Sequence, residues 1–568
     1  MILKNKNYIL LTILFSCFLV SIHHATLDSS EVISKTAMVA SQDEYATDTG
    51  ISILKEGGNA IDAAVAVAYT MAVTHPRAGN IGGGGFMMIY HKQSDQVYAL
   101  DFREKAPKKA YRDLFLNEDG SVDNEKARFS IFSAGVPGTV AGLEAAHQRF
   151  GSISRERLLN DAIYYAENGF IVDSDQKKVL TKKVEFLTKD NQFKKHFYNK
   201  KKNSFSPKNK IVQKNLAKTL KSIQQQGKKG FYEGKVAENF VSFFEENKGL
   251  ITLDDLKSYE PVWRKPIQGK YKDQYNIVSM PPPSSGGIAI IELLNIIEAL
   301  ELENTKHNSV DYIHNIVEAM KYTYADRATH LGDQDFVSIP IEMLTSKEYA
   351  KSIANQISTK NITAIKAIKP DLFEDSESLE TTHFSIIDKD GNIVSCTYTL
   401  NFAFGNGMIA GKTGVILNNE MDDFSAKPGS PNGFGLLGNE KNEIAPEKRM
   451  LSSMSPTIVF QNEKPFLITG SPGGSTIITS VLQIILNVID YDMTIGQASS
   501  AARFHHQWFP DIIFMEKEHN PKNIEILKNK GFKIENRRLG ITQSILVKDN
   551  SLFGKSDPRN ISSSTKGY

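Results

Sequence analysis

Residues 380–401, ETTHFSIIDKDGNIVSCTYTLN, decide how this chain is interpreted. The segment predicts two adjoining β-strands, with Thr381 at the start of the first and Thr399 on the second. A threonine hydroxyl is a poor nucleophile unless a base lies beside it. Cutting the chain just before a threonine supplies the threonine's own α-amine as that base. The segment therefore predicts a precursor that breaks the bond between Glu380 and Thr381.

The threonine pair offers two candidate nucleophiles, which strand geometry separates. Neighbouring strand residues point to opposite faces, so only one of Thr381 and Thr382 can face a common site. A free α-amine has an ordinary pKa of about 8, close enough to working pH to take the hydroxyl proton directly or through one water. His383 shares the face of Thr381, but we interpret it as a packed or hydrogen-bonded histidine, because the amine already supplies the base.

Ten short motifs, this segment included, follow one another in a fixed order along the chain. They are GGNAIDAAVA (57–66), GNIGGGGF (79–86), DFREKAP (101–107), SAGVPGT (133–139), PPPSSGG (281–287), TTHFS (381–385), TYTLN (397–401), NNEMDDFSAKPG (418–429), KRMLSSMSPT (448–457) and GSPGGS (470–475). Each motif alone is weak evidence, but ten in order are strong. Together they make the chain resemble γ-glutamyltranspeptidases of the bacterial type over nearly its whole length after the leader.

The resemblance sharpens a fold prediction that the pattern makes independently. Short alternating strands beside apolar helices suggest sheets that are covered on both outer faces. The resemblance implies an α+β fold, the four-layer α-β-β-α sandwich of the N-terminal-nucleophile hydrolases, formed jointly by two fragments of a self-cleaved precursor. The implied division is a signal peptide over 1–25, a large fragment over 26–380 and a small fragment over 381–568.

The resemblance also assigns the reacting groups. Thr381 is the implied nucleophile, and Thr399 is the threonine whose hydroxyl touches it. Gly473 and Gly474 lie between a strand-like segment and a helix predicted to start near Ser475. Backbone N–H groups at a helix N-terminus carry partial positive charge and lack internal partners, so they suit a tetrahedral oxyanion.

A second set of residues would recognise the glutamyl group, which carries an α-carboxylate and an α-ammonium. The planar guanidinium of Arg103 matches a carboxylate, and serine hydroxyls add donors. Carboxylate and amide oxygens can accept from the ammonium. By resemblance the carboxylate set is Arg103, Ser452 and Ser453, and the ammonium set is Asn401, Glu420 and Asp423.

The implied activity is transfer of a γ-glutamyl group from glutathione or a related donor to water, an amino acid or a dipeptide. It needs no cofactor and no metal. The expected partners are these small molecules and the chain's own second fragment, with no nucleic acid, and no membrane after leader removal. Two alternatives stay open: an amide acylase of the same architecture that acts on β-lactam side chains, and a secreted binding protein that does not process.

Residues 428–449 correspond to the family's lid over the glutamyl pocket. Many bacterial members carry a tyrosine where Phe434 stands, and phenylalanine cannot form the hydrogen bond of that hydroxyl. Gly433 beside it predicts a looser loop. Because lid closure excludes water, the balance between hydrolysis and transfer is expected to respond to this position.

The first residues predict a targeting segment. Lys4 and Lys6 precede an apolar run from Tyr8 to Ile22, which is short for a membrane span, and Ala25 offers a small residue for cleavage. An uncleaved anchor, or lipidation at Cys17, is the alternative. The mature protein is expected to be periplasmic or secreted. With Cys17 removed, Cys396 has no disulfide partner.

Other signals favour ordinary structural roles. The glycines at 82–85 follow a helix and precede a strand, the reverse of a dinucleotide-binding fingerprint. The span 177–229 holds seventeen lysines against two acids, and we interpret it as a solvated helical face because the net charge is only +2. The adjacent His505 and His506 point in different directions and make poor joint metal ligands.

The remaining hydrophobic pattern predicts further elements. Helices are expected over 59–73, 285–300, 308–330 and 475–489, with a polar helical region over 155–250. Strands are expected over 86–91, 97–102, 383–388, 392–400, 414–418, 457–461 and 465–470. Residues 350–380 have the composition of an exposed loop, where a processed junction would lie.

Overall fold

The computed structural model describes residues 27–197, 210–368 and 381–568. The predicted leader, the end of the predicted junction loop and Glu380 lie outside the described residues.

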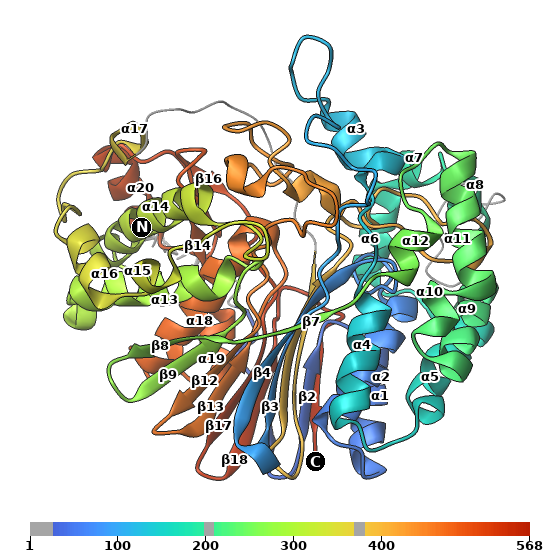
Figure 1. Cartoon of the computed structure of the whole chain (residues 1–568). Coiled ribbons are helices and arrows are strands. Elements are labelled where there is room, and N and C mark those ends of the chain that lie inside the picture. Colours follow the sequence, from blue (N-terminus) through green and yellow to red (C-terminus); the bar gives the residue numbers. More distant parts are fainter. Residues whose placement is uncertain (1–26, 198–209, 369–380) are drawn as a thin grey trace, which may run out of the picture.

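Two seven-stranded sheets form the centre of the molecule (Figure 1). In spatial order, the first contains β1 (Val32–Ser34), β18 (Ser551–Ser556), β17 (Gln543–Lys548), β13 (Lys464–Thr469), β12 (Thr457–Gln461), β9 (Tyr275–Ser279) and β8 (Ile267–Tyr271). The second contains β19 (Ser564–Gly567), β2 (Met38–Ser41), β10 (Thr382–Ile387), β11 (Ile393–Thr399), β3 (Gly84–His91), β4 (Gln96–Asp101) and β7 (Val262–Arg264). Neighbouring strands within both sheets are antiparallel.

Helices cover the outer face of each sheet, which completes the predicted four layers (Figure 1). The first sheet is covered by α13 (Gly286–Ala299), α14 (Val310–His330), α16 (Lys347–Ala354) and α18 (Ile477–Ile489). The second is covered by α1 (Glu44–Lys55), α2 (Ala60–Thr74) and α4 (Thr139–Phe150). Outside these helices, α5 (Arg155–Asn168) packs on α2, followed by α9 (Lys214–Gln226) and α11 (Gly234–Glu246) (Figure 1). The prediction of an α-β-β-α sandwich is confirmed.

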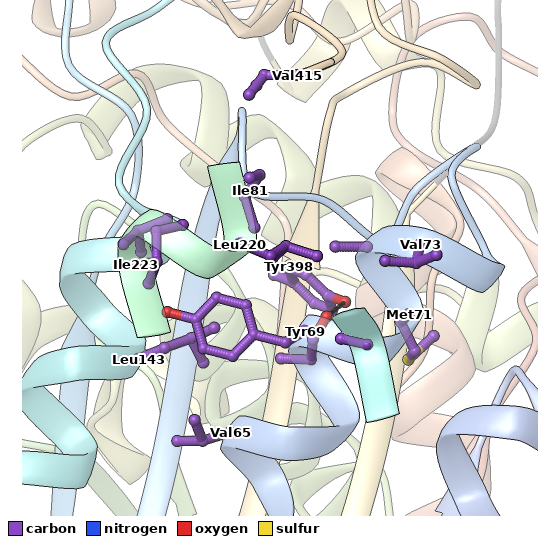
Figure 2. Close-up of a cluster of buried hydrophobic side chains, with 14 of the residues drawn as sticks. Val65, Tyr69, Met71, Val73, Ile81, Leu143, Leu220, Ile223, Tyr398 and Val415 are labelled. Carbon is purple, nitrogen blue, oxygen red and sulfur yellow. Dashed lines mark hydrogen bonds between the residues drawn. The ribbon is translucent and has the colours of Figure 1, made fainter. Parts of the chain in front are cut away.

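The helix α2 shows why the sequence folds this way. Asn59 caps its N-terminus, and the carboxylate of Asp62 accepts a hydrogen bond from the backbone N–H of Asn59, which completes a capping box. Every residue from Ala60 to Thr74 is buried, so the small side chains let other elements pack on all sides. In Figure 2, Tyr69 of this helix lies in one apolar core with Tyr398 of β11. The Tyr398 hydroxyl donates to the Ala68 carbonyl at 3.0 Å.

Most predicted elements exist near their predicted bounds, but the strand expected over 414–418 does not. Only an isolated bridge joins Ile416 to Ile409 there. Gly414 is left-handed, with φ of +76°, which breaks a strand. The side chain of Asn418 donates instead to the carbonyls of Gly82 and Gly135, so this segment is held by a side chain rather than by a ladder.

The glycine-rich run confirms its predicted order, because α2 ends at Thr74 and β3 begins at Gly84. A Cβ atom on Gly83 would collide with the carbonyl oxygen of Thr399. The glycine therefore allows the chain to approach β11 closely, next to one of the predicted reacting residues.

Candidate active site

Thr381 lies directly before β10, the strand between β2 and β11 in the middle of its sheet. Its side chain is buried, and its hydroxyl lies 3.5 Å from the hydroxyl of Thr399. Thr399 Oγ1 accepts from the backbone N–H of Asn401 at 2.8 Å, and Asn80 Nδ2 donates to the Thr399 carbonyl at 2.8 Å. The hydroxyl of Thr399 is therefore held by Asn401 and its backbone by Asn80, while Thr381 lies at the edge of a cavity.

That cavity brings together nine of the ten residues that sequence reasoning placed in the site. It is lined by Arg103, Arg327, Thr381, Thr399, Asn401, Glu420, Asp423, Phe434, Leu436, Ser452, Ser453, Met454, Gly474 and Ile477. Its free volume is about 20 Å³, room for little more than one water molecule. The structure therefore represents a closed pocket.

Charged side chains form one end of the cavity. The buried guanidinium of Arg103 forms ion pairs with Glu420 and, at 2.6 Å, with Asp423, and its Nε donates to the Met450 carbonyl at 3.3 Å. Burial raises the pKa of Glu420 and of Asp423 above the ordinary range. The group predicted to bind a carboxylate thus pairs with two groups predicted to bind an ammonium.

A third carboxylate, Glu104, lies 3.6 Å from the guanidinium of Arg103 and is fully buried. Burial raises the pKa of Glu104 to about 7. Glu104 belongs to the DFREKAP motif, but nothing in the sequence pattern indicated that its carboxylate lies beside the ion pairs of Arg103.

The two serines have their oxygens already engaged as acceptors. Ser452 Oγ accepts from the N–H of Met454 at 3.2 Å, and Ser453 Oγ accepts from Arg327 Nη2 at 3.3 Å. Asn401 donates its Nδ2 to the Asn419 carbonyl at 2.9 Å, which leaves its Oδ1 as an acceptor.

The opposite end of the cavity is built from backbone. Gly473 and Gly474 have φ of +137° and +55°, and they open a 3₁₀ turn that leads into α18. The predicted helix start beside the glycines is confirmed. Gly474 lines the cavity, but Gly473 does not. A Cβ on Gly473 would collide with the hydroxyl of Thr476 in the same turn, at 2.5 Å.

The lid segment is folded over the cavity. The ring of Phe434 is buried and packs edge-to-face on Phe402, with 5.4 Å between ring centroids. Gln507 Nε2 donates to the Phe434 carbonyl at 3.0 Å, and the N–H of Gly433 donates to Asp422 Oδ2 at 2.8 Å. A Cβ on Gly433 would collide with Phe402. In this conformation the missing Cβ of Gly433 permits tight packing against Phe402.

His383 is packed and hydrogen-bonded, as predicted. Its Nδ1 pairs with Thr397 Oγ1 at 2.8 Å and its Nε2 with Ser385 Oγ at 3.1 Å. Burial lowers the pKa of His383 to about 3, so the ring is neutral at working pH.

The paired histidines point to separate partners, His505 to Thr479 and Gln507, and His506 to Asp511. Over the ranges that the structure describes, no group of three or more His, Cys, Asp or Glu residues could hold a metal ion.

Sequence reasoning missed four residues of the cavity wall. Leu436, Met454 and Ile477 supply apolar surface, and Arg327 on α14 supplies a second guanidinium. The first three lie within or next to quoted segments, whereas Arg327 belongs to no motif and looked like any polar residue on a helix.

The fold and the buried threonine at the head of a central strand define the class of N-terminal-nucleophile hydrolases. Cephalosporin acylase from Bacillus halodurans has this architecture, with a TM-score of 0.83 at 25% identity over 95% of this chain and 97% of that chain. γ-Glutamyltranspeptidase from Helicobacter pylori aligns with a TM-score of 0.56 at 44% identity, over 58% of this chain and 93% of that chain.

Sequence comparison defines the family within this class. Residues 46–566 match the family model described as Gamma-glutamyltranspeptidase. The glutathione hydrolase proenzyme of Escherichia coli K12 is 48% identical over 94% of this chain and 93% of its own length. The corresponding proenzyme of Pseudomonas aeruginosa PAO1 is 42% identical over 94% of each chain. The chain belongs to the γ-glutamyltranspeptidase family.

Proposed function

We propose that this chain is a self-processing γ-glutamyl transferase and hydrolase that acts on glutathione and related γ-glutamyl compounds. The observation that carries the proposal is one closed cavity that holds Thr381 beside a buried set of opposite charges. A γ-glutamyl group has the matching features, because its α-carboxylate and α-ammonium lie at one end and its amide carbonyl at the other.

In the processing step, Thr381 Oγ1 attacks the carbonyl carbon of Glu380. The peptide bond is replaced by an ester, and the nitrogen of Thr381 becomes a free amine. Water then hydrolyses the ester and leaves fragments 26–380 and 381–568. Each sheet contains strands from both sides of the proposed cut, which supports fragments that stay together after cleavage.

In the turnover step, the substrate α-carboxylate binds Arg103, Ser452 and Ser453. Its ammonium binds Asn401, Glu420 and Asp423, which draws the two carboxylates away from Arg103. Opposite charges of the substrate would thus replace the internal ion pairs of the closed pocket, so no charge is left buried alone.

The chemistry then takes place at the uncharged end. The α-amine of Thr381 takes the hydroxyl proton, and Oγ1 attacks the γ-carbonyl carbon. Thr399 supports the geometry of the hydroxyl, and backbone N–H groups at Gly473 and Gly474 stabilise the oxyanion. The amine leaves with a proton, and water or the amine of an amino acid or dipeptide attacks the ester.

The finer expectations about location belong to this proposal as well: we infer a periplasmic or secreted enzyme whose leader is removed. Within the described residues, no helix is both long and apolar enough to cross a membrane.

The acylase alternative shares the fold of the Bacillus halodurans neighbour, so fold alone does not separate the two functions. The charged end of the cavity favours the γ-glutamyl function. A β-lactam side chain without an α-carboxylate and an α-ammonium would not pair with Arg103, Glu420 and Asp423.

The test is the product profile of the purified protein with glutathione, in the presence and absence of Gly-Gly. We expect glutamate and Cys-Gly without acceptor, and γ-glutamyl-Gly-Gly in addition with acceptor. A protein that processes but releases no glutamyl product from glutathione would contradict the proposed activity.

A further inference from the structure

A second guanidinium lines the cavity. Arg327 projects from α14, is buried, and donates its Nε to Ser285 Oγ at 3.0 Å and its Nη2 to Ser453 Oγ at 3.3 Å. Among the residues that the structure describes, it forms no ion pair, whereas Arg103 forms ion pairs with Glu420 and Asp423. The two arginines of the cavity are therefore in different electrostatic situations.

The hydrogen bond from Arg327 determines whether the hydroxyl of Ser453 can donate or accept toward the cavity. An arginine side chain only donates, so Ser453 Oγ must accept, and its own hydroxyl proton points elsewhere. Ser452 is in the same position, because its oxygen accepts from the N–H of Met454. Both hydroxyl protons are thus available to an anion that enters the cavity.

The charge of Arg327 is only partly compensated. Desolvation lowers the pKa of Arg327 to about 10, although the negative charge of Asp423 acts in the opposite direction. Arg103 has its positive charge offset by two carboxylates in the closed pocket. An anionic ligand held at Ser452 and Ser453 would therefore meet the positive charge of Arg327 through Ser453.

We propose that Arg327 is a positioning residue for recognition of the substrate α-carboxylate. Its hydrogen bond orients Ser453 so that the serine hydroxyl can donate to the carboxylate. Its guanidinium adds a positive charge to that of Arg103, which is paired with Glu420 and Asp423. This inference rests on the proposed γ-glutamyl specificity and deepens it: Arg327 makes the enzyme select donors that carry an α-carboxylate.

The same helix provides a control. Tyr324, one turn before Arg327 on α14, donates its hydroxyl to the carbonyl of Ser475 beside the glycine turn. Tyr324 therefore supports the end of the cavity where the amide reacts, and Arg327 supports the end that holds the carboxylate. Loss of either contact disturbs the same helix at neighbouring positions, but the two losses should affect different features of the substrate.

The experiment compares three p-nitroanilide donors with the processed enzyme. γ-L-Glutamyl p-nitroanilide has both charged groups, the glutaryl compound lacks the ammonium, and the 4-aminobutanoyl compound lacks the carboxylate. For R327Q we expect a rise in KM of about tenfold to a hundredfold for the two donors with a carboxylate, and little change for the third. The kcat/KM preference for γ-glutamyl over 4-aminobutanoyl should fall by the same factor.

R327K keeps the charge and should lose only part of this preference, because lysine cannot reproduce the two fixed donors of the guanidinium. It also provides the comparison if R327Q does not process. S453A should lose the carboxylate preference too, and adding R327K to S453A should cost little more. Y324F should lower kcat/KM for all three donors by a similar factor.

An unchanged preference in processed R327Q or R327K would overturn the inference, and so would a loss shared equally by the donor without a carboxylate. If the wild-type protein itself does not prefer γ-glutamyl over the 4-aminobutanoyl donor, the proposed function fails instead. The two failures are therefore distinguishable.

Discussion

The two ends of the cavity differ in the chemical groups that line them. The proposed recognition end consists of charged side chains, with Arg103 paired to Glu420 and Asp423. The reaction end has hydroxyls and glycine backbone: Thr381 and Thr399 lie 3.5 Å apart, next to the turn at Gly474. Under the proposed function, charges would select the substrate and exchange partners when it binds, whereas neutral groups would already be in place for the chemical step. The predictions below test this division.

The largest effect is expected at the reaction end, from Thr381→Ala. The variant should stay one uncut chain and lose turnover by about 10⁴-fold or more, because it lacks the attacking oxygen for both steps. Denaturing gels and γ-glutamyl p-nitroanilide assays measure these outcomes. Thr382→Ala is the matched control, since Thr382 belongs to β10 and pairs with Tyr398. Processing of the Thr381→Ala chain would place the nucleophile elsewhere.

At the recognition end, Arg103→Lys should raise KM for a γ-glutamyl donor by about tenfold or more, with a smaller effect on kcat. Lysine keeps the charge but loses the bidentate geometry that holds a carboxylate. Steady-state kinetics of the processed variant give both constants. An unchanged KM would remove Arg103 from carboxylate binding, and a loss confined to kcat would assign it to the reaction end.

The charged end should also make stability depend on pH. Burial raises the pKa of Glu104 from 4.5 to about 7, so the folded protein retains a proton there that the unfolded chain has released. The contribution of Glu104 to stability should therefore decline as pH rises from about 4.5 to about 7, by up to about 3 kcal/mol.

Glu104→Gln removes the group responsible for this decline. The difference in thermal midpoint, variant minus wild type, should therefore be larger at pH 8 than at pH 5. Scanning calorimetry at both pH values measures the difference, with Glu118→Gln, at an exposed position, as the control. A difference that does not change with pH would show that Glu104 does not bind the additional proton.

The smallest effect is expected at the lid, which covers both ends. Phe434→Tyr adds a hydroxyl that can hydrogen-bond across the closed loop, and one neutral hydrogen bond contributes about 0.5–1.5 kcal/mol. The ratio of transfer to hydrolysis should therefore shift by several-fold, while processing stays normal. Product analysis with glutathione and Gly-Gly measures the ratio. Equal ratios would show that this position does not control closure.

The sequence predicted residues of both ends of the cavity where they lie in short motifs, and it missed Arg327, which lies in none. Thr381, Thr399 and Gly474 belong to short local patterns, in which strand alternation or a helix start fixes the geometry. Arg327 acts through tertiary contacts with Ser285 and Ser453, so no local pattern distinguishes it from a surface arginine.

The fold shows the same limit. The four layers followed from alternating strands and apolar helices, but the strand expected over 414–418 is absent. A left-handed Gly414 and the contacts of Asn418 with two distant carbonyls override its β-like composition. The ring of Phe402, which leaves no room for a Cβ at Gly433, is likewise distant in the sequence and could not be predicted from the local pattern.

The central claim is that Thr381 becomes the N-terminal residue of the small fragment and carries the chemistry. The most direct measurement is N-terminal sequencing of the small fragment of the purified protein, before and after reaction with a γ-glutamyl donor analogue that forms a stable adduct. We predict a sequence that starts Thr-Thr-His-Phe-Ser, with the adduct on the first residue. A fragment that begins at Thr382 or elsewhere, or an adduct on another residue, would contradict the account.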